Sequence, residues 1–184
     1  MRVTAGALRG RRLLAPRGRD TRPTSDRARA GLFDWLGSAV AESLWLDLFA
    51  GSGSVGIEAL SRGALHVVFV ERSRAACQVL GRNLAALGLE ARSRVLDSDV
   101  STALARLSKR GERFDWIFAD PPWARGPGPE LAALVARVAP GGRLVVERGA
   151  HHARAAAPAG LVHVESRAWG ETLFDRYRRE ESGQ

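Results

Sequence analysis

From residue 44 onward, short apolar runs alternate with stretches of helical spacing, and this alternation restricts the possible folds more than any other feature. The apolar runs of strand length occupy residues 44–48, 67–70, 95–96, 116–119 and 144–146. Stretches with apolar residues at helical spacing separate them, at residues 55–62, 74–87, 100–109 and 130–138. Because parallel strands need crossover helices, the pattern predicts an α/β fold with a parallel sheet covered on both faces. Two last runs, 161–168 and 172–177, predict a terminal β-hairpin.

The positive charge of the chain is concentrated at its beginning. The whole chain has 28 basic and 20 acidic side chains, for a net charge of +8. Residues 1–29 hold nine arginines against Asp20 and Asp26, whereas the remaining residues are nearly neutral, with 19 basic and 18 acidic side chains. We interpret residues 1–25 as a basic arm or hairpin that contacts a polyanion, and residues 26–184 as one domain. Glycines and prolines in the arm argue against the amphipathic helix of a transit peptide.

Composition argues against several classes of protein. Cys77 is the single cysteine, which excludes an internal disulfide and fits a reducing cytosol. No apolar run approaches the roughly 20 residues that cross a bilayer, so we expect a cytoplasmic protein without a membrane partner. His151 and His152 are adjacent and lack a carboxylate cluster, so we expect no metal site.

The first candidate site is a glycine-rich turn after the first expected strand. It runs from Asp47 to Gly56 with the sequence Asp-Leu-Phe-Ala-Gly-Ser-Gly-Ser-Val-Gly, and such glycines allow close approach of a ligand to free backbone N–H groups. Asp47 suits a ligand with an ammonium group better than a pyrophosphate. Glu71 ends the next strand, where an acidic side chain holds ribose hydroxyls. These residues favour S-adenosylmethionine over a dinucleotide; the alternative is a tight strand-to-helix turn without a ligand.

A further acidic residue follows the third expected strand. Asp99 could accept a hydrogen bond from the amino group of adenine in the same crevice. Asp99 is also a suitable N-cap for a helix that begins at Val100, and the two roles are compatible.

The second candidate site is Asp120-Pro121-Pro122-Trp123, which ends the fourth expected strand. Proline cannot continue a central strand, so the backbone leaves the sheet at its carboxyl edge. The Asp120 carboxylate and the Pro121 carbonyl match the two N–H donors of an exocyclic amino group, and Trp123 can stack on the base. The acceptors would position the nitrogen for methyl transfer and stabilise positive charge that grows on it. The alternative is a strand-terminating turn without chemistry.

These residues resemble one family, the RsmD-type methyltransferases, which modify the 2-amino group of a guanine in bacterial 16S ribosomal RNA. The most specific part of the likeness is Arg-Pro-Thr-Ser-Asp-Arg at residues 22–27. The other matching stretches are 9–13, 32–36, 46–53, 56–64, 69–71, 120–123 and 169–172. The resemblance implies a Rossmann-like methyltransferase sheet of seven strands, mostly parallel, with a C-terminal antiparallel hairpin.

The resemblance also assigns roles to individual residues. The cofactor-binding residues for S-adenosylmethionine would be Asp47, Phe49, Ala50, Gly51, Ser52, Gly53, Glu71, Asp99, Val100 and Thr24. The catalytic residues that hold the base would be Asp120, Pro121, Pro122 and Trp123. Separately from the resemblance, the charge of the arm leads to the hypothesis that Arg9, Arg11, Arg12 and Arg22 bind RNA phosphates. The chain departs from the family at Trp123, where Tyr or Phe is usual, and at Ala30, where many members have Glu.

The sequence therefore predicts methyl transfer from S-adenosylmethionine to a guanine 2-amino group in 16S ribosomal RNA. We expect a monomer, whose substrate is either free RNA or an assembling small subunit. One alternative is a DNA methyltransferase acting on adenine or cytosine amino groups, although 184 residues leave little room for its target-recognition domain. The other is a non-catalytic RNA-binding protein that retains S-adenosylmethionine, against which the intact Asp-Pro-Pro-Trp motif argues.

Overall fold

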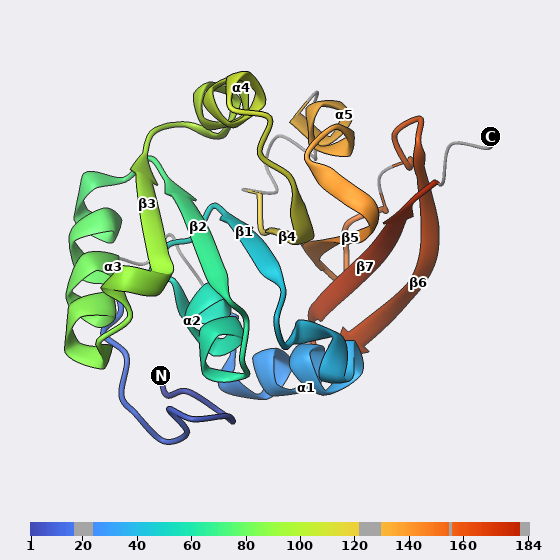
Figure 1. Cartoon of the computed structure of the whole chain (residues 1–184). Coiled ribbons are helices and arrows are strands. Elements are labelled where there is room, and N and C mark those ends of the chain that lie inside the picture. Colours follow the sequence, from blue (N-terminus) through green and yellow to red (C-terminus); the bar gives the residue numbers. More distant parts are fainter. Residues whose placement is uncertain (17–23, 122–129, 155, 181–184) are drawn as a thin grey trace.

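Seven strands form one sheet in the order β3-β2-β1-β4-β5-β7-β6 (Figure 1). The computed structural model describes residues 1–16, 24–121, 130–154 and 156–180. The strands are β1 Leu44–Leu48, β2 His66–Glu71, β3 Ser93–Asp97, β4 Phe114–Ala119, β5 Val138–Gly149, β6 Leu161–Trp169 and β7 Thr172–Arg179. The α-helices are α1 Asp26–Leu36, α2 Ser54–Ser61, α3 Arg74–Leu87, α4 Val100–Lys109 and α5 Glu130–Val135.

The strands β1 to β5 run parallel to one another. Strand β7 lies between β5 and β6 and is antiparallel to both. The predicted α/β fold with a parallel sheet and a terminal hairpin is therefore confirmed. The helix expected over residues 130–138 is shorter than predicted, because it ends at Val135. Val138 instead begins β5, where it pairs with Phe114 and is fully buried. Sheet pairing overrides the helical spacing at this residue.

Helices cover both faces of the sheet (Figure 1). One face packs against α1, α2 and α3, drawn in blue to green, through residues such as Leu32, Leu60 and Leu80. The other face packs against α4 and α5 through Leu104 and Leu134. No helix in the described parts of the chain has both the length and the apolar character needed to cross a membrane.

The terminal hairpin is fixed against α1. Ser25 caps this helix, since its side chain accepts a hydrogen bond from the Ala28 N–H at 3.1 Å. Gly31 lies against the hairpin, and a Cβ at this position would come within 2.1 Å of the Trp169 indole nitrogen. Trp35 donates a hydrogen bond to Glu165 on β6. The contacts of Gly31 and Trp35 hold the hairpin beside α1.

Residues 1–16, the described part of the basic arm, are docked on the body of the protein. Arg2 and Arg12 form an antiparallel bridge, and Val3 and Leu13 are buried in the core. Buried Glu58 of α2 receives the arm: its carboxylate accepts hydrogen bonds from the Thr4 hydroxyl at 2.6 Å and the Thr4 N–H at 2.8 Å. The same carboxylate accepts from the Ala5 N–H and from the Arg29 and Arg62 side chains. The arm is thus part of the folded core.

Candidate functional site

Four acidic side chains lie at the carboxyl edge of four neighbouring strands. They are Glu71 at the end of β2, Asp47 on β1, Asp120 directly after β4 and Glu147 on β5. We call these four residues the carboxylate row. Ligands of open α/β sheets bind at this edge, because the loops between strands and helices open there.

Strand register places the carboxylate row on one face of the sheet. Asp47 pairs with Phe118, which lies two residues before Asp120, and Phe118 pairs with Val145, which lies two residues before Glu147. Alternate residues of a strand share a face, so these acids lie on the face covered by α1, α2 and α3. The two sites expected from the sequence, the glycine-rich turn and the Asp-Pro motif, therefore meet at one place.

The glycine-rich turn between β1 and α2 has an unusual backbone. Gly51 and Gly53 have φ values of +56° and +79°, and Phe49 has a φ of +59° although it carries a side chain. A Cβ on Gly53 would lie 2.2 Å from the Leu80 side chain, whereas a Cβ on Gly51 would meet no atom within 4 Å. A left-handed aromatic residue is an uncommon, strained conformation that concentrates at ligand-binding turns. The open side of Gly51 leaves room for a ligand at the loop.

Two members of the carboxylate row hold this turn in place. The Glu71 carboxylate accepts hydrogen bonds from the Gly51 N–H at 2.8 Å and from the Ser73 N–H at 2.7 Å. The Asp47 carboxylate accepts from the Gly56 N–H at 2.9 Å, which fixes the start of α2 to β1. Asp47 and Glu71, both predicted to bind the cofactor, therefore contact the glycine-rich turn.

Burial raises the pKa of three members of the carboxylate row, Asp47, Asp120 and Glu147. Burial, with smaller contributions from the charges of Asp120 and Glu71, raises the pKa of Asp47 to about 7. Burial also raises the pKa of Asp120 to about 7. Burial and the neighbouring charge of Asp120 raise the pKa of Glu147 to about 8. Such carboxyls favour a cationic ligand, because a nearby positive charge would stabilise their ionised forms.

The residues present fit S-adenosylmethionine. Its sulfonium and ammonium groups carry the positive charge that the buried acids lack, and its ribose has two hydroxyls for Glu71. Within the described ranges, no three His, Cys, Asp or Glu side chains come together closely enough to hold a metal ion.

The third predicted cofactor region lies at the start of α4. Asp99 is the N-cap of this helix, and its carboxylate accepts from the Thr102 N–H at 2.8 Å, the Ser101 hydroxyl at 2.5 Å and the Thr102 hydroxyl at 2.7 Å. The hydrogen bonds from Ser101 and Thr102 lower the pKa of Asp99 well below its usual range. The N-cap role is confirmed; a contact of Asp99 or Val100 with adenine stays a prediction.

The structure adds Glu147, which sequence reasoning missed. Its carboxylate accepts a hydrogen bond from the Thr24 hydroxyl at 2.6 Å, and both residues are buried. Thr24 thus contacts this acid on β5, and its expected place beside the cofactor stays a prediction. In the sequence, Glu147 belongs to neither the glycine-rich turn nor the Asp-Pro motif, and an isolated Glu gives little signal because it is usually solvated.

Asn83 of α3 joins the arm to the glycine-rich turn. Its side-chain oxygen accepts from the Leu14 N–H at 2.8 Å, and its side-chain nitrogen donates to the carbonyl oxygens of Leu14 at 3.1 Å and Ser52 at 3.0 Å. Asn83 is 2% exposed, so all three bonds are shielded from water. The arm and Ser52 of the turn therefore share one buried amide.

Three of the predicted RNA-binding arginines, Arg9, Arg11 and Arg12, are exposed. Arg11 donates to the carbonyl of Ala86 in the last turn of α3 at 3.0 Å, and the Ala7 N–H donates to the carbonyl of Ser61 at the end of α2. The turn that carries Arg9, Arg11 and Arg12 thus lies beside the C-terminal ends of two helices. Three predicted site residues, Arg22, Pro122 and Trp123, lie outside the described residues; Pro121 is described and is buried.

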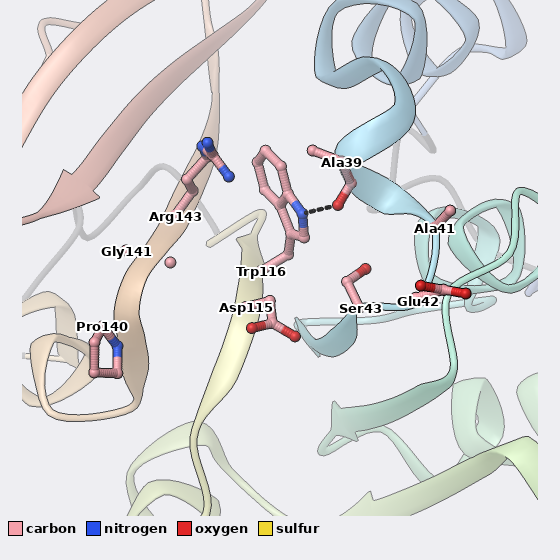
Figure 2. A pocket seen from close by; sticks show the side chains of 10 residues that line it. Ala39, Ala41, Glu42, Ser43, Asp115, Trp116, Pro140, Gly141 and Arg143 are labelled. Carbon is pink, nitrogen blue, oxygen red and sulfur yellow. Dashed lines mark hydrogen bonds between the residues drawn. The ribbon is translucent and has the colours of Figure 1, made fainter.

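A surface hollow of about 320 Å³ lies at the opposite, amino edge of the sheet (Figure 2). Trp116 forms part of its lining and donates from its indole nitrogen to the Ala39 carbonyl at 3.0 Å. The Arg143 guanidinium lies 5.1 Å from the centre of the Trp116 ring, and the Asp115 carboxylate accepts from the Leu44 N–H at 2.8 Å. Trp116, Asp115 and Ser43 of this hollow are engaged in contacts within the protein, so we place the candidate site at the carboxyl edge.

Comparisons with known proteins agree with this geometry. A family model described as "Conserved hypothetical protein 95" matches residues 1–178. The Escherichia coli (strain K12) protein named "Ribosomal RNA small subunit methyltransferase D" is 34% identical over 187 residues, which cover 100% of this chain and 92% of that protein. The protein YlbH of Bacillus subtilis is 44% identical over 123 residues, which cover 67% of each chain.

Solved structures show the same architecture. The structure of yhhF from Escherichia coli superposes with a TM-score of 0.83 at 35% identity and covers 98% of both chains. A SAM-dependent methyltransferase from Agrobacterium tumefaciens has a TM-score of 0.64 at 20% identity and covers 83% of this chain and 62% of that chain. The second likeness concerns the fold alone.

Proposed function

We propose a reaction for this chain on the premise that it belongs to the family described as conserved hypothetical protein 95, the RsmD-type methyltransferases. The chain is accordingly an rRNA methyltransferase that uses S-adenosylmethionine. The reaction that we propose is methylation of the exocyclic 2-amino group of a guanine in small-subunit ribosomal RNA.

The cofactor side of the site consists of the glycine-rich turn with Asp47 and Glu71. S-adenosylmethionine supplies an electrophilic methyl group on a positively charged sulfur. Asp47 favours the ammonium group of that ligand through its buried negative charge, and Glu71 is in the place to accept hydrogen bonds from the ribose hydroxyls. The open side of Gly51 admits the ligand to the backbone.

The acceptor side begins at Asp120, and its position is the observation that carries the proposal. Asp120 leaves β4 at the carboxyl edge, between Asp47 and Glu147 in the order of the strands, and buried Pro121 follows it. The carboxylate and the Pro121 carbonyl are two acceptors for the two hydrogens of an amino group. They would hold the nitrogen in line with the methyl group and stabilise its developing positive charge.

The target guanine must leave its helix to reach Asp120, because its amino group lies in the minor groove. The exposed arginines of the arm lie beside the ends of α2 and α3, so we propose that they bind phosphates of the surrounding RNA. Base choice and RNA attachment then belong to different parts of the protein.

The decisive experiment offers tritiated S-adenosylmethionine to 16S ribosomal RNA, to assembled small subunits and to DNA, and then maps the labelled nucleotide. We expect label on the 2-amino group of one guanine in RNA or in the subunit. Label on adenine or cytosine of DNA, or no transfer to any substrate, would overturn the proposal.

Two variants on the same strand provide a matched control. Asp120→Asn removes the charge at the carboxyl end of β4 and should reduce the methyl-transfer rate about 100–1000-fold, while its affinity for S-adenosylmethionine stays near that of the parent. Asp115→Asn changes the same residue type at the other end of β4 and should leave the rate unchanged. Full activity of Asp120→Asn would refute the role assigned to Asp120.

A further inference from the structure

Glu147 is a buried acid beside Asp120 to which the proposed reaction gives no task. Ala119 and Val146 pair in the parallel ladder between β4 and β5, so Asp120 and Glu147 follow paired residues on neighbouring strands. Neighbouring strands are about 4.8 Å apart, which brings the second carboxyl next to the first. Glu147 is 6% exposed. A buried carboxyl in such a position is costly unless a partner uses it.

The described groups around Glu147 are one hydrogen-bond donor, one apolar side chain and two acids. Thr24 donates to Oε2 at 2.6 Å, and Phe174, its pairing partner on β7, is apolar. The acids that face it are Asp120 and Asp47. Within the described part of the chain, no cation forms an ion pair with Glu147.

Two described arginines near Thr24 and Glu147, Arg29 and Arg148, form ion pairs with other acids. Arg29 of α1 donates to the Thr24 carbonyl at 3.5 Å and forms ion pairs with Glu58 and Asp26. Arg148 follows Glu147 in β5 and therefore points to the other face, where it pairs with Asp175 at 2.7 Å. Among the described residues, Glu147 therefore has a hydrogen-bond donor in Thr24 and no cationic partner.

The chemistry of the bases shows what such an acceptor recognises. In guanine the ring N1–H donor is adjacent to the 2-amino group, so this edge presents three donor hydrogens. In adenine and cytosine the ring nitrogen next to the amino group is an acceptor, which a carboxylate repels. A second acceptor beside the one that holds the amino group therefore distinguishes guanine from the other two bases.

We propose that Glu147 accepts a hydrogen bond from guanine N1–H, with Thr24 orienting its carboxyl, and thereby selects guanine over adenine and cytosine. This assignment rests on the proposed function, because it requires a guanine amino group at Asp120. Burial raises the pKa of Glu147 to about 8, and hydrogen bonds from the base favour its charged form. Glu147 is then a specificity-determining residue, and Thr24 is its positioning residue.

The test pairs a change in the protein with a change in the RNA. The RNA carries either guanosine or 1-deazaguanosine at the mapped position; the analogue replaces N1–H by C–H with little change in shape. The protein is the parent, Glu147→Leu, which removes the acceptor, or Glu147→Gln, which keeps a neutral acceptor oxygen. Asp115→Asn serves as a control, and thermal melting and S-adenosylmethionine binding verify that each variant is folded.

We expect the parent to lose about 10–100-fold in kcat/KM and in RNA affinity when N1–H is removed, as for a hydrogen bond to a charged group. In Glu147→Leu the same removal should cost less than about 3-fold, because the partner is already absent. Glu147→Gln should give an intermediate loss, and Asp115→Asn should behave like the parent. The preference for guanine over adenine at the mapped position should fall in Glu147→Leu.

The outcomes separate this inference from the proposed function. Without label on a guanine amino group in the parent, the proposed function fails. A parent that labels guanine but binds and methylates 1-deazaguanosine RNA equally well contradicts the role of Glu147 alone. An equal loss in the parent and in Glu147→Leu contradicts it as well. If Glu147→Leu does not fold, Glu147→Gln takes its place in the comparison, and a loss in Glu147→Gln equal to that of the parent contradicts the role of Glu147.

Discussion

Two groups of buried acids in this protein have opposite surroundings. Glu58 of α2 accepts hydrogen bonds from five donors, two of them arginine side chains. At the carboxyl edge, the described residues give Asp47 and Glu147 one donor each. The difference teaches how to separate structural from functional acids: a buried carboxylate with all its partners stabilises the fold, and one with few partners is complete only with a ligand.

The largest effect on stability should come from a substitution at Glu58, the buried acid with five hydrogen-bond donors. Glu58→Gln removes the charge opposite buried Arg29 and places amide hydrogens among the donors of Thr4 and Ala5. We expect a loss of about 3–5 kcal/mol in the free energy of unfolding, measured by chemical denaturation. A stability equal to that of the parent would contradict the role of Glu58 as the anchor of the arm.

A substitution at Asp47, at the carboxyl edge, should not lower the stability of the ligand-free protein. Asp47→Asn removes a buried charge that has no cationic partner among the described residues, so the ligand-free variant should be at least as stable as the parent above pH 7. Its affinity for S-adenosylmethionine should fall about 10-fold, because the ammonium group loses its counter-charge. Calorimetric titration measures the affinity. An unchanged affinity would show that Asp47 serves only to fix the start of α2.

The pH dependence of stability sharpens the same contrast. The folded-state pKa values of Asp47 and Glu147 are raised to about 7 and about 8, so the folded protein binds more protons than the unfolded chain between about pH 4 and pH 8. These groups therefore lower the stability of the ligand-free protein as pH rises through that window. We expect the Tm to decrease by a few degrees from pH 6 to pH 8, and by less in Glu147→Leu. A Tm decrease of the same size in both proteins would contradict this assignment to Glu147.

The smallest effect concerns the surface of the arm. Replacing Arg9 and Arg12 by Gln should weaken RNA binding a few-fold and reduce the slope of log affinity against log salt by about 1 per arginine that contacts a phosphate. S-adenosylmethionine affinity should not change. Point variants are needed here because deletion of the arm would remove buried Val3 and Leu13 from the core. An unchanged salt slope would show that these arginines do not contact RNA.

Elements with a strong local pattern could be predicted from the sequence. The predicted boundaries of β1 and α3 agree with the structure, because a continuous apolar run and a long helical repeat are decided by nearby residues. The end of α5 could not be predicted, since Val138 joins β5 through pairing with Phe114. Local spacing does not contain that information.

The same distinction applies to the functional residues. The placement of Asp47, Glu71 and Asp120 at the carboxyl edge could be predicted, because each stands in a motif at the end of a strand. Glu147 could not, since only the register between β4 and β5 brings it beside Asp120. The role of Glu58 was equally hidden, because its partners Thr4 and Ala5 are more than 50 residues away in the chain.

Asn83 has a consequence for how RNA at the arm and the ligand at the glycine-rich turn influence each other. One buried amide bonds both the arm backbone at Leu14 and the turn at Ser52. Any RNA-induced shift of the arm that strains this amide changes the affinity of the turn for its ligand. Thermodynamic reciprocity then requires the ligand to change the affinity for RNA by the same factor. A single buried side chain, remote from the motif at Asp120, therefore links the arm to the turn.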